Sequence, residues 1–405
     1  MEINTIYNVD AKEGHKLLND NSINTIITSP PYYGLRDYGV NGQIGLEETP
    51  EMYVNNLVEI FRNLKTKLRD DGTLWLNLGD SYCGGSYGMS ENNDPKNNKT
   101  KGMNQRGLRI CEFCKKEYMG TINQRFCSKP CVGVDNTPRV KKGLLKPKDL
   151  IGIPWMVAFA LRSDGWYLRQ DIIWHKPNPM PESVTDRCTK AHEYIFLFSK
   201  SSKYYFDNEA IRESAKDPES YSGKRKRSYK RENEFADKFL KQNFRNIKIG
   251  QLYEKVNKRS VWTVTTKPFT EAHFATYPEE LIKDCILAGC PEFVCNVCKE
   301  PYKIDIERVD RDYFKKEDCK TKQYAKSNHN EKIEYKNNGY IPSCNCNAEK
   351  EGGIVLDPFM GAGTTALVSK KYGRNYIGFE LNPEYINIAE NRLMKELGIF
   401  YKNDM

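Results

Sequence analysis

The stretch Asp357-Pro-Phe-Met-Gly-Ala-Gly-Thr-Thr365 lies between the apolar run Ile354–Leu356 and a helical pattern over Thr364–Tyr372. A strand, a tight glycine turn and a helix N-terminus bring backbone amides close to a ligand, because glycine has no Cβ. A second predicted strand, Asn375–Phe379, is followed by Glu380, 23 residues after Asp357. Rossmann-type sites place an acidic side chain on a ribose at a spacing of roughly 20 residues. The stretch therefore predicts an α/β fold with a cofactor cradle.

The glycine turn alone leaves two other interpretations open. Gly361, Gly363 and Ala366 satisfy the pattern G-x-G-x-x-A, which would indicate a nicotinamide oxidoreductase. A turn that only packs a helix on a strand, without a ligand, gives the same residues. Motifs elsewhere in the sequence are needed to choose among a general cofactor cradle, a nicotinamide site and a packing turn.

Apolar periodicity predicts further strands and helices outside this unit. Ile23–Thr28 and Thr73–Leu78 are short apolar runs, and a helical spacing between them begins after the N-cap Thr49 and continues up to Asp71-Gly72. The other expected elements are a helix over Ile151–Leu161, strands over Trp166–Trp174 and His192–Phe198, and a helix over Pro383–Leu397. Strands and helices that alternate at this spacing favour a parallel sheet covered on both faces.

The first apolar run ends in Ser29-Pro30-Pro31-Tyr32. Two prolines fix φ and remove two backbone donors, which leaves a stiff backbone with carbonyl acceptors. The Ser29 hydroxyl and the Pro30 carbonyl can together accept both hydrogens of an exocyclic amine, and the Tyr32 ring can stack on a planar base. A plain Pro-Pro turn at a strand end is the alternative.

The charge of the chain is concentrated in two segments. The 405 residues carry a formal net charge of +9, while Lys96–Lys148 holds 14 basic and three acidic residues and residues 201–250 hold 13 basic and eight acidic residues. A near-neutral body with two basic segments suits a protein that binds a polyanion such as nucleic acid. A solvated, lysine-rich surface would give the same excess.

No part of the sequence predicts a membrane or secreted protein. No window approaches the roughly 18 consecutive apolar residues of a membrane helix, and residues 1–8 lack the pattern of a signal peptide. We therefore expect a cytoplasmic protein, in which the 13 cysteines are free or bind metal rather than form disulfides.

Two sets of cysteines have spacings that suit tetrahedral zinc. Cys111, Cys114, Cys127 and Cys131 form one set, and Cys295, Cys298, Cys344 and Cys346 form the other, with Cys319 able to replace a ligand in the second. Four thiolates leave no open position on the metal, so we expect two structural Zn²⁺ ions. Free cysteines are the alternative for each set.

The segment Thr28–Tyr32, together with Asp357–Thr365, resembles the amino-DNA methyltransferases that use S-adenosylmethionine. The catalytic motif precedes the cofactor motif, as in the β group of that family. Leu74–Asp80, Trp174–Lys176 and His192-Glu193 resemble its other sheet motifs, and residues 273–278 resemble the segment over the methionine moiety. Ala362 and Tyr277 depart from the family, which commonly has serine and lysine at these positions.

The resemblance implies a Rossmann-like methyltransferase fold, with a mostly parallel seven-stranded sheet and helices on both faces. The cysteine spacings and the basic segments add zinc-binding and target-recognition insertions to it. Catalysis would fall to Ser29, Pro30, Pro31 and Tyr32. Ser29 and Pro30 would hold the amine of a flipped base, and Tyr32 would stack on the base. The cofactor residues implied by the resemblance are Asp10, Thr28, His273, Thr276, Asp357, Phe359, Gly361, Gly363, Thr364, Thr365, Glu380 and Asn382.

The resemblance favours N4 of cytosine in double-stranded DNA as the target, because Ser-Pro-Pro-Tyr is more typical of N4-cytosine enzymes than of N6-adenine enzymes. N6-adenine methylation is the first alternative, and a catalytically silent, zinc-dependent DNA-binding protein is a more remote one. A bacterial or phage origin, a homodimer and a cognate restriction endonuclease are compatible with the family.

We expect the catalytic core to comprise residues 1–85, 150–205 and 260–405. Residues 86–149 would form a basic zinc-binding insertion, and residues 206–260 a basic target-recognition region that contacts DNA through Lys224, Arg225, Lys226 and Arg227. Residues 291–350 would form a second cysteine insertion, similar to a zinc ribbon, within the core.

Overall fold

The structure is a computed structural model that describes residues 1–35, 40, 42–83, 107–110, 117–120, 145–146, 148–215, 255–266, 276–309 and 334–398. The chain divides into two compact units. The first contains Met1–Pro30, Ile60–Asn77 and Asp164–Met405, and the second contains Pro31–Glu59 and Leu78–Ser163. Of the helices within the described ranges, none is long and apolar enough to cross a membrane.

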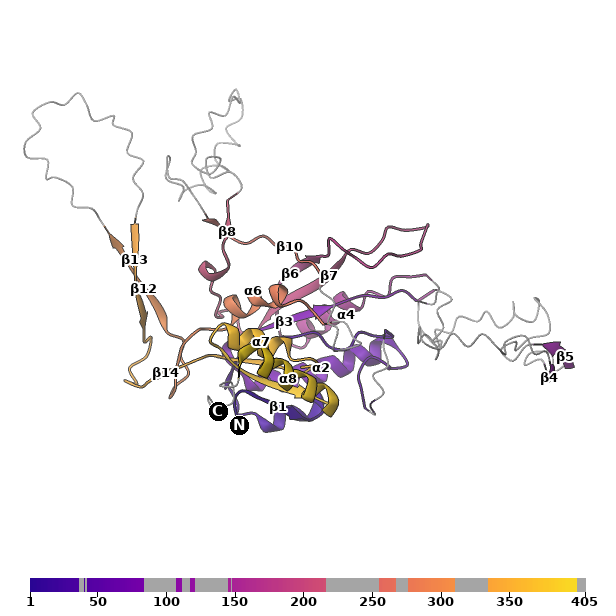
Figure 1. The fold of residues 1–405 in the computed structure, drawn as a ribbon, viewed down its shortest axis with the longest axis horizontal. Helices are drawn as coiled ribbons and strands as arrows, with labels where there is room; N and C mark the ends of the chain where they lie inside the picture. The colour runs from indigo at the N-terminus through magenta and orange to yellow at the C-terminus, as the bar shows by residue number, and fades with distance from the viewer. Residues whose placement is uncertain are drawn as a thin grey trace, which may run out of the picture. The chain divides into compact units, whose positions relative to one another are not determined.

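A mixed sheet of eight strands forms the centre of the first unit (Figure 1). In spatial order its strands are β1 (Thr5–Asn8), β16 (Asn375–Glu380), β15 (Ile354–Asp357), β2 (Ile23–Thr28), β3 (Leu68–Leu78), β7 (His192–Ser199), β6 (Tyr167–His175) and β10 (Val261–Thr263). β1, β16, β15, β2 and β3 are parallel to one another, and β10 is parallel to β6, whereas β6 and β7 are antiparallel. The expected mostly parallel sheet is confirmed, with eight strands in the described residues rather than seven.

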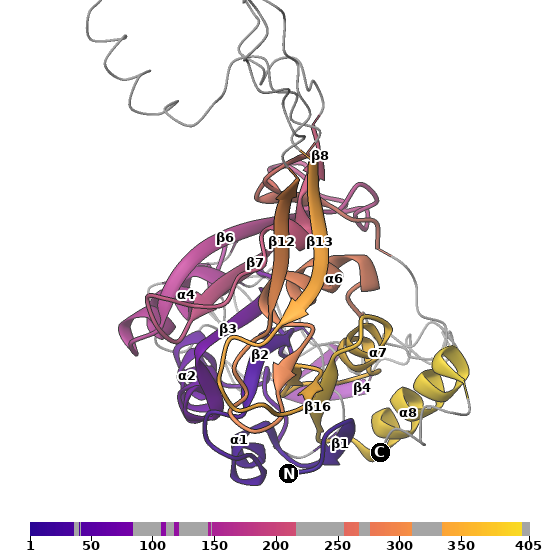
Figure 2. The same cartoon turned by 90° about the vertical axis from the view of Figure 1, so that its left-hand side faces the viewer.

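Helices pack on both faces of this sheet. Tyr376 of β16 contacts a core formed with α7 (Thr364–Lys371) and α8 (Pro383–Leu397). Phe379 points to the other face, where it lies against Gly14 of the short helix α1 (Ala11–Gly14), so close that an added Cβ would be 2.4 Å from the ring. The helix α6 (Glu279–Gly289) packs against β2, β3 and β15 in a second apolar cluster. Figure 2 gives a second view of these helices.

The boundary between the helix α2 (Pro50–Lys67) and β3 differs from the sequence prediction. The helical spacing predicted a helix up to Asp71-Gly72, but the strand already begins at Leu68, which pairs with Ile23 of β2. A shift in register follows, before Thr25 pairs with Thr73. Leu68 fits the apolar spacing of the helix, but its backbone pairs with Ile23 of β2, so the residue belongs to the strand. The predicted N-cap is confirmed, because the Met52 amide donates to the Thr49 hydroxyl at 3.3 Å.

In the second unit, the described part contains the start of α2, the hairpin β4 (Gly107–Ile110) and β5 (Glu117–Gly120), and the helix α4 (Ile153–Ser163). The Asp80 carboxylate accepts from the backbone amides of Gly152 at 3.0 Å and Ile153 at 3.1 Å, and so caps α4. The Cys83 amide donates to the Asp149 carbonyl at 2.8 Å, and the Lys148 amide to the Cys83 carbonyl at 2.7 Å. Cys83 and Lys148, which flank the segment 84–147, are therefore held side by side by backbone hydrogen bonds.

Three two-stranded pieces and two short 3₁₀ helices complete the described part of the first unit. The pairs are β8 (Glu213–Ser214) with β9 (Lys255–Val256), β11 (Val294–Cys295) with β14 (Lys350–Glu351), and β12 (Lys303–Val309) with β13 (Glu334–Ile341). The 3₁₀ helices are η1 (His15–Leu17) and η2 (Glu209–Ile211). Figures 1 and 2 both show β12 and β13 side by side as an extended ribbon.

Candidate active site

Asp357 is the centre of a hydrogen-bond network at the carboxyl end of β15. One carboxylate oxygen accepts from the Thr28 hydroxyl at 2.6 Å and from the Phe359 amide at 3.0 Å. The other accepts from the Tyr277 hydroxyl at 2.9 Å and from the Thr365 hydroxyl at 2.5 Å. The residue is completely buried. Burial raises the pKa of Asp357, and the four hydrogen bonds oppose this rise. Because its donors include Thr28 and Thr365, Asp357 joins the ends of β2 and β15 to α7.

Tyr277 takes part in this network from the residues just before α6. Its hydroxyl contacts both Asp357 and the Thr365 hydroxyl. Burial and the neighbouring Asp357 carboxylate raise the pKa of Tyr277 well above its ordinary value, so the phenol stays protonated and donates. The sequence marked Tyr277 only as a departure from the family's lysine. Its contact with Asp357, 80 residues away, could not be derived from local pattern.

The Glu380 carboxylate, at the end of β16, is hydrogen-bonded to the glycine turn that follows β15. One of its oxygens accepts from the Gly361 amide at 2.8 Å, and the other accepts from the Asn382 amide at 2.8 Å. Burial raises the pKa of Glu380. The side chain keeps partial exposure at the end of β16, and each oxygen has a further acceptor position, so this carboxylate has the chemistry to bind a hydroxyl ligand.

Asp10 lies at the same edge of the sheet. β1 and β16 are parallel with Asn8 opposite Glu380, and Asp10 follows two residues after β1 ends. The Asp10 carboxylate accepts from the Lys12 amide at 2.9 Å and caps α1. The structure therefore brings Asp10 and Glu380 to adjacent strand ends, as a shared cofactor site requires.

The glycine turn serves packing as well as any ligand. Gly361 and Gly363 have φ of 53° and 75°, in the left-handed region that favours glycine. A Cβ on Gly363 would also lie 2.8 Å from the Cβ of Ala389 in α8. At the start of α7, the Thr364 hydroxyl accepts from the buried Arg392 at 2.8 Å. Arg392 had no sequence signal, because it lies on α8 and reaches the turn only through tertiary packing.

The motif Ser29–Tyr32, predicted to be catalytic, begins where β2 ends. Within the first unit, Ser29 is half-buried and Pro30 is buried, directly after Thr28, which is bonded to Asp357. Within the second unit, the Pro31 carbonyl accepts from the Tyr53 hydroxyl at 2.9 Å. The Tyr32 ring lies against Gly79, where an added Cβ would be only 2.5 Å from the ring carbon Cε2. Gly79 had not been singled out, and it leaves the space that the Tyr32 ring uses.

The remaining predicted cofactor residues have simpler surroundings. Asn382 caps α8, its side chain accepting from the Glu384 amide at 2.9 Å. Thr276 and Phe359 are half-buried. His273 lies outside the described residues, as do Lys224, Arg225, Lys226 and Arg227, so their roles stay predictions.

The cysteine sets differ in what the structure describes. Cys111, Cys114, Cys127, Cys131 and Cys319 lie outside the described residues. Cys295, Cys298, Cys344 and Cys346 come together, with all four sulfur atoms within 4.8 Å of one another. The second predicted set is therefore one cluster in space.

A family model described as DNA methylase, for N6 and N4 methyltransferases, matches residues 23–293 and 346–391. The chain belongs to this DNA methylase family. It is 38% identical over 398 residues to the Type II methyltransferase M.Cfr9I of Citrobacter freundii, an alignment that covers 98% of this chain and 90% of the relative. It is 35% identical over 386 residues to the Type II methyltransferase M.SmaI of Serratia marcescens, covering 95% and 89%.

Among solved structures, the PvuII DNA methyltransferase (cytosine-N4-specific) aligns with a TM-score of 0.48 at 14% identity, over 98% of this chain and 89% of that chain. The family match confirms the expected amino-DNA methyltransferase of the N4/N6 family. It also contains both Ser29–Tyr32 and Asp357–Thr365, whereas it passes over residues 294–345. Cys295, Cys298 and Cys344 thus lie outside the part of the chain that the family model matches.

Proposed function

We propose that this DNA methylase transfers a methyl group from S-adenosylmethionine to N4 of a cytosine in double-stranded DNA. The observation that carries the proposal is the 2.6 Å hydrogen bond from Thr28 to Asp357. It joins the residue before Ser29 to the first residue of the glycine turn, although the two are 329 positions apart. An amine held at Ser29 would therefore lie close to a donor held at the turn.

The residues at the carboxyl ends of β1, β15 and β16 fit the proposed cofactor. Glu380 would accept hydrogen bonds from the ribose hydroxyls, and Asp10 would accept one from the adenine amine. Gly361 and Gly363 let the backbone approach the ligand without a Cβ in the way. Asp357, with all four of its hydrogen bonds inside the protein, would position the turn. S-adenosylmethionine supplies an already activated methyl group, so much of the acceleration would come from positioning.

The motif Ser29–Tyr32 would hold the flipped base. The Ser29 hydroxyl and the Pro30 carbonyl would accept the two hydrogens of the amine, which turns the nitrogen lone pair toward the methyl group. Tyr32 would stack on the base, an interaction worth ~1–3 kcal/mol. Its ring is seated on Gly79, which supports a fixed stacking face rather than a mobile side chain.

The choice of cytosine over adenine rests on Ser29. Both amines present two hydrogens, and the serine hydroxyl can accept one from either. Ser-Pro-Pro-Tyr is the form more typical of N4-cytosine enzymes in the family that this chain resembles. The relatives M.Cfr9I and M.SmaI are named Type II methyltransferases, which supports a role beside a restriction endonuclease.

The test is methylome sequencing of DNA from cells that express the chain, with matched variants at Tyr32. We expect N4-methylcytosine at one recognition sequence. Tyr32→Phe keeps the stacking ring and should keep most methylation, whereas Tyr32→Ala should lose turnover even at saturating DNA. N6-methyladenine would move the target to adenine, and full single-turnover rate in Tyr32→Ala would remove the catalytic role of the motif.

The basic segments would supply DNA affinity. Neutralising Lys224, Arg225, Lys226 and Arg227 should weaken DNA binding and flatten its salt dependence, by up to ~0.9 in slope for each DNA phosphate that is no longer neutralised. Saturating DNA should restore the methylation rate of this variant. A variant that keeps the wild-type salt slope would place the DNA-binding residues elsewhere.

A further inference from the structure

We propose that Cys295, Cys298, Cys344 and Cys346 bind one structural Zn²⁺. This ion fixes the cysteine ribbon, which is formed by β11 paired with β14, to the amino ends of the sheet strands. The four sulfur atoms lie within 4.8 Å of one another. A tetrahedral zinc with Zn–S bonds of about 2.3 Å places its sulfur atoms about 3.8 Å apart. The thiols therefore need to close by no more than about 1 Å to coordinate the ion.

The backbone has the same unusual conformation directly after both cysteine pairs. Lys299, directly after Cys298, has φ of 60°, and Asn347, directly after Cys346, has φ of 50°. Left-handed backbone is uncommon in residues other than glycine, yet it follows the second cysteine of both pairs. Past the first pair the chain reverses, and the Cys295 amide donates to the Glu300 carbonyl at 2.9 Å. The sulfur atoms of both pairs meet in one cluster.

Within the described ranges, few buried apolar side chains surround the four cysteines. Cys295 and Val294 are buried, but Cys298 and Cys344 are half-buried, Cys346 is exposed, and Val297 between the first two cysteines is 69% exposed. Thiols that only filled a core would be surrounded by apolar side chains. A small loop region without a core of its own usually depends on a metal or disulfides for its fold. A donor set of four thiolates favours zinc.

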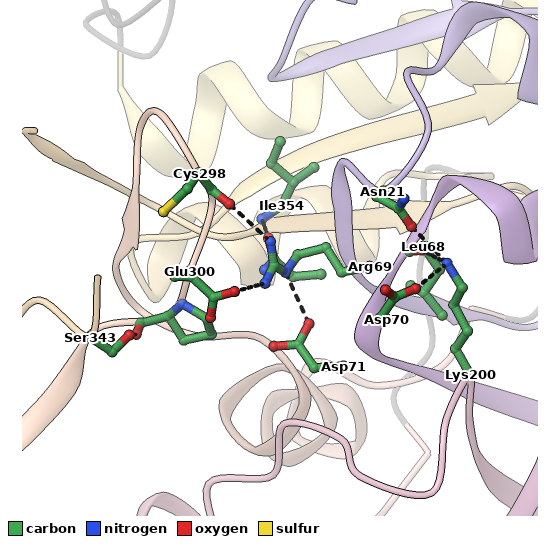
Figure 3. Close-up of polar contacts among 12 residues, drawn as sticks. Asn21, Leu68, Arg69, Asp70, Asp71, Lys200, Cys298, Glu300, Ser343 and Ile354 are labelled. Atoms are coloured by element: carbon green, nitrogen blue, oxygen red, sulfur yellow. Dashed lines mark hydrogen bonds and ion pairs between the residues drawn. The ribbon is translucent and has the colours of Figure 1, made fainter. Parts of the chain in front are cut away.

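Arg69 connects this cluster to the sheet, as Figure 3 shows. It is the second residue of β3 and is buried. Its guanidinium donates to the Cys298 carbonyl at 3.4 Å, to the Glu300 carboxylate at 3.4 Å and to Asp71 at 2.9 Å. Groups that hold the backbone of a metal ligand orient the ligand for the ion, so Arg69 is a positioning residue for Cys298.

The position of the cluster makes the metal structural rather than catalytic. Arg69 stands at the amino end of β3, and the amide of Ile354, the first residue of β15, is bonded to Asn24 near the start of β2 at 2.8 Å. Asp357 is the last residue of β15, roughly 10 Å further along the strand at about 3.3 Å per residue. Zinc at the amino ends therefore cannot touch a cofactor at the carboxyl ends.

The test compares zinc content in the full-length chain. Cys298→Ser should contain one zinc equivalent fewer than the wild type, whatever the Cys111 set binds, while Cys188→Ser, which removes an exposed cysteine outside the cluster, should contain as much as the wild type. Equal zinc in Cys298→Ser and wild type would overturn the proposal, as would iron in place of zinc.

A second measurement covers the case in which Cys298→Ser does not fold. Thiol alkylation of the wild-type chain, followed by peptide mass mapping, should leave Cys295, Cys298, Cys344 and Cys346 unmodified until a chelator is added. Amide exchange should then rise in residues 294–301 and 341–351 but not in β15 and β16. Prompt alkylation without chelator, or disulfides among the four, would contradict the zinc site, and neither readout depends on methyl transfer.

Discussion

The carboxyl and amino ends of the same parallel strands are held together in different ways. At the carboxyl ends, Asp357 accepts four hydrogen bonds from protein donors and is fully buried. At the amino ends, the cysteine ribbon contacts the sheet through Arg69 and has an exposed Val297 beside its thiols. The first region is fixed by hydrogen bonds within the protein, whereas the described part of the second has few buried apolar side chains around its thiols.

This difference is the one expected between a cofactor-binding site and a structural metal site. A cofactor site must stay in place while its ligand comes and goes, so its geometry has to be fixed by the protein alone. A structural metal is not exchanged during turnover, and its binding free energy can replace a missing core. The two ends should therefore respond independently to mutation.

The largest effect should come from Asp357→Ala. Four donors are deprived of their acceptor, and each one left buried without a partner costs about 1–3 kcal/mol. We expect a lower thermal unfolding midpoint, loss of cofactor binding and unchanged zinc content. Asp357→Asn, which keeps the size of the side chain, should be less severe. Wild-type cofactor affinity in Asp357→Ala would show that the network does not hold the glycine turn.

A smaller effect is expected for Glu380→Gln, and it should depend on pH. Burial raises the pKa of Glu380, so the wild-type carboxylate takes up a proton at a higher pH than an ordinary carboxyl group. Cofactor affinity should be full above this raised pKa and fall as the pH decreases through it. Glutamine cannot ionise, so its pH profile should be flatter.

Loss of a charged acceptor typically costs ~1.5–3 kcal/mol, or roughly tenfold or more in affinity. Calorimetric titration at several pH values measures both the loss and the profile. Equal pH profiles for the variant and the wild type would exclude Glu380 from the cofactor site.

The next effect is at the amino ends. Arg69→Ala removes the hydrogen bonds to Asp71, Glu300 and the Cys298 carbonyl, and we expect the free energy of unfolding to fall by about 1.5 kcal/mol. Amide exchange should rise in residues 294–301 while cofactor affinity stays the same. A weakened cofactor site in this variant would show that the two ends are coupled.

The smallest effect should come from the matched control Arg62→Ala. Arg62 also pairs with an aspartate, Asp164, but its side chain is 60% exposed. Surface ion pairs contribute little, so we expect a change of about 0.5 kcal/mol and no change in exchange at the ribbon. A thermal shift as large as that of Arg69→Ala would mean that burial of Arg69 is not what matters.

Local sequence patterns predicted the elements that carry their own signal. The helix Pro383–Leu397 begins and ends as expected, and the glycine turn lies between β15 and α7 as expected. β1 and β10 were not predicted, because both are short and mix polar with apolar residues, unlike the apolar run of β15. Both are strands through pairing with β16 and β6.

Tertiary contacts explain what the sequence could not show at the site. Tyr277, Arg392 and Gly79 reach Asp357, Thr364 and Tyr32 from distant parts of the chain, and no spacing rule links them. The positions of the motif residues at a strand end and in a glycine turn were predictable, since both features have local signatures, while their roles stay predictions. Their partners depend on which strands become neighbours, and this follows only from the folded sheet.

The most direct test of the central claim is transfer of an isotope-labelled methyl group from S-adenosylmethionine to DNA by the purified chain. The DNA is digested to nucleosides, and the labelled species is identified by mass spectrometry. The account predicts label in N4-methyldeoxycytidine, and none when Tyr32→Ala replaces the wild type in a single-turnover reaction. DNA that stays unlabelled with the wild-type chain, or label carried only by another nucleoside, would contradict it.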